Sequence, residues 1–156
     1  MNIRLLPLLL LFLILSCSSR EVCTDEDQSA MVARFKTVES ESIKDTILEG
    51  VTIWGIREGV PGNLLYDSST LSRIVLPLDP NNNNTTFLVK INDQTDTIRV
   101  NHIIEFYMKS YACGFASLFK LENTEVSGDM IFNTEITKSQ VDAELEQNEE
   151  HLWIYF

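Results

Sequence analysis

Two histidines, three cysteines and a run of asparagines are the residues of this chain whose types could support chemistry. His102 and His151 lie far apart, and neither has a His, Cys or carboxylate neighbour at the spacing of a zinc-ligand set. No serine stands in a Gly-x-Ser-x-Gly nucleophile elbow. General acid–base catalysis needs converging groups, which the sequence does not present. We therefore predict no metal ion, no cofactor and no catalytic residue, in a protein that is not an enzyme.

One loop imitates a calcium site. Asp79, Asn81 and Asn83 have the spacing of the first ligands of an EF-hand loop. Asn84 replaces the glycine expected at the sixth position, and Lys90 stands where the bidentate glutamate should be. A loop between two strands is the better interpretation.

The first seventeen residues carry a targeting pattern. Arg4 supplies a positive start, and the apolar run Leu5–Leu15 is about half of the roughly 20 residues that a membrane-spanning helix needs. Ser16 and Cys17 follow this apolar run directly. The order of an apolar run, a small residue and a cysteine resembles a lipobox, at which cleavage leaves an acylated cysteine as the first residue. We expect residues 1–16 to be a signal peptide and Cys17 to be lipidated. The alternative is a plain secretory peptide with a chance cysteine.

The residues after Cys17 indicate a location and a tether. Ser18 stands where an Asp would retain a lipoprotein in the inner membrane in familiar Gram-negative sorting. We therefore expect the outer membrane of a cell envelope, with its periplasmic and surface faces both open. Residues 17–27 are polar and charged, which suits a short tether, and residues 28–156 are expected to form one domain.

The other two cysteines form an even pair. In an oxidising compartment disulfides persist, so we expect Cys23 and Cys113 to be bonded. Closing a loop of about 90 residues would contribute about 4–5 kcal/mol in the chain-entropy model. Two free thiols are the alternative, because sequence does not give the geometry.

The charge balance restricts the partners. The chain has 12 Lys and Arg against 23 Asp and Glu, a net charge of −11. No basic cluster could neutralise nucleic-acid phosphates or anionic lipid heads. We therefore expect no nucleic acid, a membrane contact through the lipid on Cys17, and an unidentified protein or glycan partner.

Apolar residues alternate with polar ones along most of the chain after residue 30, the pattern of half-buried strands. Turn signals separate these runs, as at 59–63, 79–84 and 92–94. Only residues 137–150 have a helical pattern, with Ser139 and Asp142 spaced as a capping box. Strands are predicted at 31–36, 51–55, 71–78, 87–91, 98–100, 104–108, 115–121, 130–136 and 152–156.

Eight or nine short strands without alternating helices predict an all-β fold. We expect an antiparallel β-sandwich with Greek-key connections, immunoglobulin-like or similar. A break in the pattern near Asn101-His102 predicts that 98–100 and 104–108 are separate strands.

Several segments together resemble a known family. They are Cys23, Leu76-Pro77-Leu78, the stretch from Ile104-Glu105-Phe106-Tyr107 to Ala112-Cys113-Gly114-Phe115, and the closing residues 150–156. Over most of residues 17–156 the chain is similar to a family of small Bacteroidota envelope lipoproteins with no assigned function. The resemblance implies a Gram-negative cell envelope, supports the disulfide and supplies no catalytic residue.

Two short sequences are candidate modification sites. Asp45-Thr46-Ile47 and Asp96-Thr97-Ile98 resemble the Asp-Ser/Thr-apolar O-glycosylation sequon of that phylum. Thr46 and Thr97 would need exposure beside a turn to carry a glycan. Coincidence is the alternative, because these residues are common.

Two functional hypotheses remain open. In the first, the sandwich presents an edge strand or loop face to a partner, with Trp54 and Trp153 as contact candidates. In the second, a barrel or splayed sandwich carries a small ligand in an apolar cavity. A pocket lined by Phe106, Phe115 and Phe119 would favour the carrier.

Overall fold

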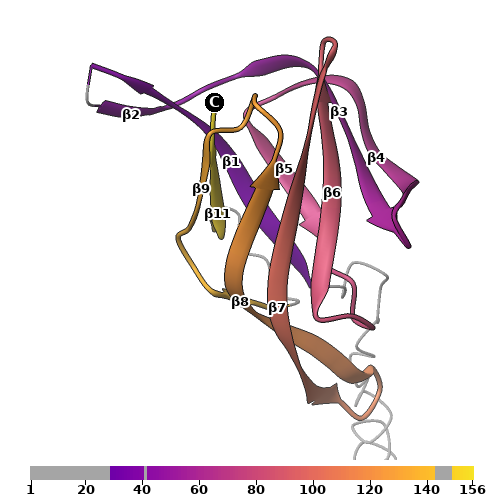
Figure 1. The fold of residues 1–156 in the computed structure, drawn as a ribbon. Coiled ribbons are helices and arrows are strands. Elements are labelled where there is room, and N and C mark those ends of the chain that lie inside the picture. The colour runs from indigo at the N-terminus through magenta and orange to yellow at the C-terminus, as the bar shows by residue number, and fades with distance from the viewer. Residues whose placement is uncertain (1–28, 41, 143–148) are drawn as a thin grey trace, which may run out of the picture.

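The computed structural model describes residues 29–40, 42–142 and 149–156. In that part the chain forms eleven strands and no helix, arranged as two sheets (Figure 1), so the predicted all-β sandwich is confirmed. The strands are β1 (Ala30–Glu39), β2 (Ser42–Asp45), β3 (Leu48–Arg57), β4 (Val60–Leu71), β5 (Arg73–Pro77), β6 (Asn84–Ile91), β7 (Gln94–Ser110), β8 (Gly114–Ser127), β9 (Asn133–Ile136), β10 (Gln140–Val141) and β11 (Leu152–Tyr155).

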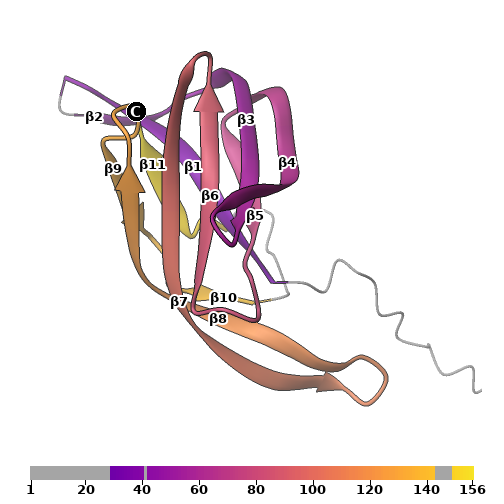
Figure 2. The same ribbon diagram turned by 45° about the vertical axis from the view of Figure 1, so that its right-hand side comes forward.

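The strands divide into sheets A and B. In sheet A, β1 pairs in parallel with β11, and β9 pairs with the other side of β11 in the antiparallel sense. The opposite side of β1 pairs with β5 through its first half and with β2 through its second half. Sheet B is antiparallel, in the order β10-β8-β7-β6-β3-β4 (Figure 2). The parallel β1–β11 pair departs from the antiparallel sandwich that we predicted.

Apolar positions from both sheets fill the space between them. Burying one such side chain contributes about 1.5–3 kcal/mol relative to leaving it in water. These apolar positions alternate with polar ones along several strands, which is the pattern from which the strands were predicted. The fully buried large apolar side chains include Met31, Phe35, Ile74, Leu76, Leu152 and Ile154 from sheet A and Ile53, Phe87, Ile98 and Phe119 from sheet B.

The β3–β4 connection is shorter than predicted. Arg57 pairs with Val60, so the turn consists of Glu58 and Gly59 alone, with φ values of 53° and 81°. Positive φ at both central residues matches the twist of a two-residue hairpin. Pro61 and the residues after it, predicted as turn, begin β4 instead. Proline is tolerated there because β4 lies at the edge of sheet B.

The break at Asn101-His102 is a bulge and does not separate two strands. Strand β7 is continuous from Gln94 to Ser110, and its register with β8 shifts between Asn101 and His102. Asn101 pairs with Asn123 and His102 pairs with Leu121, so β8 carries the extra residue. Such bulges interrupt the alternation without ending the strand.

The predicted helix at 137–150 is wrong for the described residues of that stretch. Gln140 and Val141 form β10, which pairs with Lys120 and Phe119 of β8. Val141 is fully buried, so burial and strand pairing override the local helical pattern. Residues 143–148 lie outside the described part.

Strands β7 and β8 run past the sandwich as a paired extension (Figure 2), which we call the arm and define as residues 103–118. Their pairing continues to Ser110 and Gly114, and Cys113 lies in the closing turn. Across the described ranges, no helix is long and apolar enough to span a bilayer.

Candidate functional site

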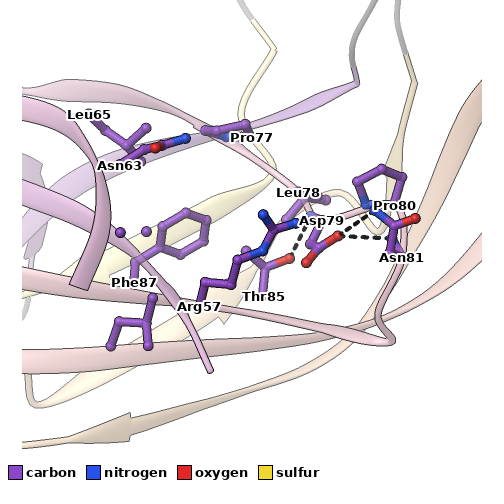
Figure 3. A pocket seen from close by; sticks show the side chains of 13 residues that line it. Arg57, Asn63, Leu65, Pro77, Leu78, Asp79, Pro80, Asn81, Thr85 and Phe87 are labelled. Atoms are coloured by element: carbon purple, nitrogen blue, oxygen red, sulfur yellow. Dashed lines mark hydrogen bonds between the residues drawn. The ribbon is translucent and has the colours of Figure 1, made fainter. Parts of the chain in front are cut away.

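An open cleft lies between β3, the start of β4 and the loop that joins β5 to β6 (Figure 3). Its volume is about 330 Å³, within the range usual for small-molecule sites. Polar groups and apolar walls alternate around it. The lining includes the polar residues Arg57, Asn63, Asp79, Asn81 and Thr85 and the apolar residues Leu65, Pro77, Leu78 and Phe87.

The carboxylate of Asp79 organises the loop beside the cleft. Its Oδ1 accepts a hydrogen bond from the backbone N–H of Asn81 at 2.9 Å, and its Oδ2 accepts one from Nδ2 of Asn82 at 2.8 Å. These bonds hold the pKa of Asp79 below its usual range. The calcium-like spacing therefore serves a turn, and no cluster of potential metal ligands occurs among the residues that the structure describes.

A buried threonine–histidine pair lies behind the loop. Oγ1 of Thr85 is 2.9 Å from Nε2 of His102 and accepts a hydrogen bond from the Asp79 N–H at 2.8 Å. Nδ1 of His102 has no hydrogen-bond partner in the described structure. Burial lowers the pKa of His102, which favours the neutral ring. The pair resembles a nucleophile and base, but no described residue forms a hydrogen bond that orients the imidazole from its other side. The bonds of Thr85 to His102 and to the Asp79 N–H anchor the loop.

Two glycines keep the cleft open. A side chain added at Gly55 would meet open space, because no other atom lies within 4 Å of its Cβ position. At Gly62 an added Cβ would lie 3.2 Å from the carbonyl oxygen of Gly55, so the two strands approach closely there. Neither glycine was predicted as a site residue, and Gly62 was predicted to lie in a turn. A glycine inside a strand is a recognised sign that two backbones approach closely.

A second, more polar hollow adjoins the first across Arg57 and Asp79 and extends to Arg99. Arg57 forms no ion pair with the described carboxylates, although it lies close enough to Asp79 to help lower the pKa of that residue. Glu58 and Asp79 also line this hollow, so its two arginines are balanced by two carboxylates. A hydroxyl-rich ligand, which both donates and accepts hydrogen bonds, suits such a surface.

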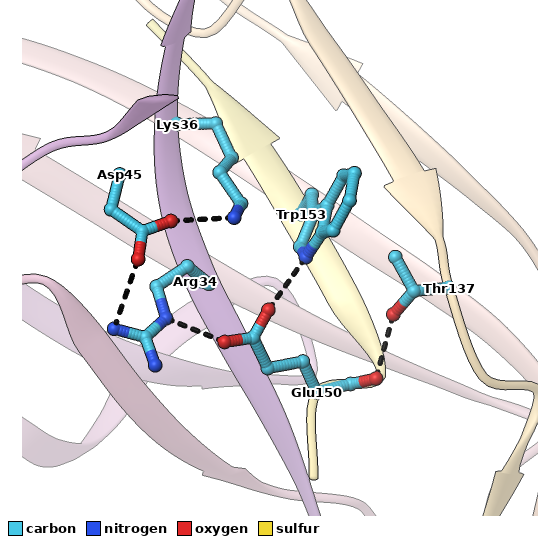
Figure 4. A network of polar contacts seen from close by, with 6 residues as sticks. All are labelled: Arg34, Lys36, Asp45, Thr137, Glu150 and Trp153. Atoms are coloured by element: carbon cyan, nitrogen blue, oxygen red, sulfur yellow. Dashed lines mark hydrogen bonds and ion pairs between the residues drawn. The ribbon is translucent and has the colours of Figure 1, made fainter. Parts of the chain in front are cut away.

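A polar network ties β1 to β2 and to the start of β11 (Figure 4). Glu150 accepts hydrogen bonds from Arg34 Nε and Trp153 Nε1, each at 2.7 Å. Lys36 donates to Asp45 at 2.5 Å and lies 4.2 Å from the centre of the Trp153 ring. The Lys36 bond lowers the pKa of Asp45, and the Trp153 and Arg34 bonds outweigh burial to lower that of Glu150. The network therefore holds β1, β2 and β11 together.

The cysteine predictions fall mostly outside the described residues, since Cys17 and Cys23 precede residue 29. Cys113 lies in the turn that closes the arm and is not a free thiol. Its N–H donates to the hydroxyl of Ser110 at 3.1 Å. The Cys23–Cys113 bond and the lipid on Cys17 stay predictions.

The two candidate glycosylation sites differ in their surroundings. Thr46 follows β2 and is half-buried, and its neighbour Asp45 belongs to the network of Figure 4. Thr97 lies within β7 at the centre of sheet B, and the preceding Asp96 is buried, where its carboxylate accepts the N–H groups of Met130 and Ile131. Thr46 and Thr97 are both half-buried, and both sites stay predictions.

The pocket that would have favoured a carrier is not present as predicted. Phe119 is buried in the core, whereas Phe106 and Phe115 are exposed on the arm, with 63% and 73% of their surface in solvent. Phe119 therefore does not line a common enclosed pocket with Phe106 and Phe115. Trp54 and Trp153 are both half-buried, and the nitrogen of Trp153 is bound to Glu150.

The described fold defines an all-β sandwich domain with an open surface cleft. Residues 50–156 match the model of a family of unknown function, DUF6452, and the chain belongs to that family. The resemblance to a family without assigned function is confirmed at that level. Comparison with curated proteins and with solved structures gives no match.

Proposed function

We propose that this chain is a lipid-anchored cell-envelope protein that binds a glycan in the cleft of Figure 3 without catalysing a reaction. Cys17 carries the acyl chains once residues 1–16 are removed, and residues 17–27 form the tether. Several acyl chains on one cysteine make attachment lasting, because one chain alone gives only reversible binding. The lipobox-like pattern and the resemblance to Bacteroidota lipoproteins support an outer-membrane location.

The residues that line the cleft support a glycan as its ligand. Sugar hydroxyls both donate and accept hydrogen bonds, and the cleft offers donors on Arg57, both functions on Asn63 and acceptors on Asp79. Leu65 and Pro77 supply the apolar wall against which the C–H face of a sugar ring packs. This mixture of directed polar groups and apolar walls is the single observation on which the binding role rests.

The same geometry supports a role without catalysis. Thr85 and His102 are both buried, and Thr85 already accepts the Asp79 N–H. A general base must reach a proton of its substrate at about 2.6–3.2 Å or through one water. His102 lies behind Thr85 and does not itself line the cleft, so we expect its imidazole not to reach a substrate there.

Filling the cleft tests the binding role. In Gly55→Leu the new side chain would extend into open space, so the fold should survive while the cleft closes. Purified wild-type protein should bind members of an array of bacterial and host glycans, and Gly55→Leu should lose at least about tenfold in affinity, about 1.4 kcal/mol. Phe132→Leu, at an exposed position outside the cleft lining, is the matched control. Equal binding by wild type and Gly55→Leu, or no glycan bound by wild type, would refute the proposal.

A separate measurement tests the anchor. The intact mass of the protein from its native host should show loss of residues 1–16 and acyl additions on Cys17. Cys17→Ser should move the protein from the membrane to the soluble fraction. A native protein that lacks acyl mass and stays soluble would refute the anchoring without bearing on the cleft.

A further inference from the structure

We infer that the tip of the arm, residues 103–118, lies in the headgroup region of the lipid bilayer beside the anchor. The inference rests on the proposed anchoring and goes beyond it, because it gives the domain a second membrane contact and a fixed orientation. We thus assign a lipid bilayer as the binding partner of the apolar side chains of the arm.

The apolar surface of the arm continues the core face of sheet B. Along β7, Ile98 and Val100 face the core, and Phe106 and Met108 stand on the same face further along, beyond the bulge. Met108 pairs with Phe115 of β8, so these side chains share that face. Both are exposed, because no described strand of sheet A lies opposite them. A core-like face without its covering sheet marks an interaction site.

The end of the arm has the side chains of a membrane interface. Tyr111 lies in the closing turn with 99% of its surface exposed, and the exposed pair Met108–Phe115 lies close to that turn. Tyrosine has an apolar ring and a polar hydroxyl, and it is enriched at the headgroup level of bilayers. Phenylalanine extends the buried area of such contacts.

The charge of the arm is compatible with a lipid surface. Between Ile103 and Leu118 the charged residues are Glu105 and Lys109, so this segment is neutral although the chain carries −11. An acidic segment would be repelled by lipid phosphates, within about 10 Å at moderate salt. The neutral arm can therefore approach a bilayer at little electrostatic cost.

The path of the chain brings the anchor to the arm. The hydroxyl of Ser29 donates a hydrogen bond to the carbonyl oxygen of Ser117, so the chain enters β1 beside the arm. Cys17 lies 12 positions before Ser29, a reach of at most about 40 Å. With the predicted Cys23–Cys113 bond, only six positions of chain would separate Cys17 from the turn of the arm, a reach of about 20 Å. The acyl chains cannot be far from the tip.

Tryptophan quenching by brominated lipid tests the contact. The acylated protein carrying Tyr111→Trp is placed in vesicles of phosphatidylcholine, with and without bromine on the acyl chains. We expect the added emission to lose most of its intensity in brominated vesicles. Phe132→Trp is the matched control, exposed and located after the other end of β8, and its added emission should persist. The wild type, with Trp54 and Trp153, gives the background.

The outcomes separate the arm from the anchor. If the acylated protein floats with the vesicles and the added tryptophan of Tyr111→Trp is not quenched, the arm inference is wrong while the anchoring stands. Residues 17–156 with Cys17→Ser and an N-terminal histidine tag, held on nickel-chelating lipid, repeat the measurement without acylation. Quenching at position 111 there supports the arm even if the native chain proves not to be acylated. Crosslinking from position 111 to a protein, without quenching, would overturn the inference in favour of a protein partner.

Discussion

His151 is the buried group whose protonation most affects the fold. It is fully buried, and its Nδ1 accepts the N–H of Val32 at 3.1 Å, which holds the residue before β11 against β1. Burial, followed by the charge of Lys138, lowers the pKa of His151 to about 4. The folded protein therefore holds a neutral imidazole over a range in which an unfolded chain would be protonated.

We predict from this pKa that stability falls on mild acidification. The unfolded state binds more protons than the native state between about pH 6.5 and pH 4, so stability is complete above pH 6.5 and declines by up to about 3 kcal/mol as pH falls to 4. His102, whose pKa is also lowered, acts in the same direction. Asp45 and Glu150 have lowered pKa values, so their contribution is lost only in more acidic solution. Urea titrations at pH 7, 6 and 5 measure the slope, and equal stability at pH 7 and 5 would contradict the assignment.

A second prediction at the residue scale compares the half-buried ion pair of Arg34 and Glu150 with an exposed ion pair. Glu150→Ala removes the acceptor of both Arg34 and Trp153 and should cost about 2 kcal/mol, because it leaves half-buried donors unpaired. Glu39→Ala is the matched control, since its bond with Lys44 is solvent-exposed, and it should cost less than about 0.5 kcal/mol. Chemical denaturation measures both, and similar losses would show that the network of Figure 4 adds nothing.

Among the strands, those with buried apolar residues were predictable from the sequence. In β6 every second side chain is buried, as the alternation predicts. Strands β1, β3 and β11 were also predicted, although each of them buries consecutive residues. Strand β2 was missed because all four of its residues are exposed, and most of β4 is exposed at the edge of sheet B. Edge strands of this kind have no hydrophobic period to detect. Strand β10 exists through its pairing with β8, a contact that no local pattern encodes.

The β8–β9 connection gives a prediction at the scale of elements. The carboxylate of Asp96 accepts the N–H groups of Met130 at 2.9 Å and Ile131 at 2.7 Å. Gly128 has a φ of 133°, and a Cβ there would overlap that carboxylate. Gly128→Ala should therefore destabilise the fold by at least about 2 kcal/mol.

A matched glycine isolates the steric part of that cost. Gly59 also has a positive φ, 81°, but an added Cβ would meet no atom within 4 Å. Gly59→Ala should therefore cost only about 1 kcal/mol, the strain of the backbone conformation. Thermal unfolding of the two variants gives the comparison. A loss for Gly128→Ala no larger than that for Gly59→Ala would show that the carboxylate moves aside freely.

At the scale of the whole molecule, the predicted Cys23–Cys113 bond would tie the start of the chain to the arm. We predict that the denatured, unreduced mature protein has no thiol that reacts with an alkylating reagent and that reduction exposes two, Cys23 and Cys113. The native state should lose up to about 4–5 kcal/mol on reduction, a value that strain in the native bond decreases. Mass spectrometry after alkylation counts the thiols. Two alkylated cysteines before reduction would rule out the bond.

The cleft, in contrast to the anchor, could not be predicted from the sequence. Arg57, Asn63 and Asp79 belong to three segments that meet only because β3 pairs with both β4 and β6. The anchor pattern is contiguous, so its spacing is visible in the chain itself. The apolar alternation that includes Phe106 and Phe115 could be detected in the sequence, but it suggested a lined pocket. Alternation alone does not show whether a second sheet covers the apolar face, and these two side chains are exposed.

The pairing of β1 with β11 has a consequence for the timing of folding. Residues 33–36 align in parallel with residues 152–155, so the earliest described strand obtains one of its neighbours only when the latest described strand arrives. Until then one edge of β1 is bare, and the buried positions of Leu152 and Ile154 are empty. A chain that is made amino end first can therefore complete sheet A only once residue 155 is available. The pairing of β1 thus ties the last step of its folding to the arrival of the last described strand.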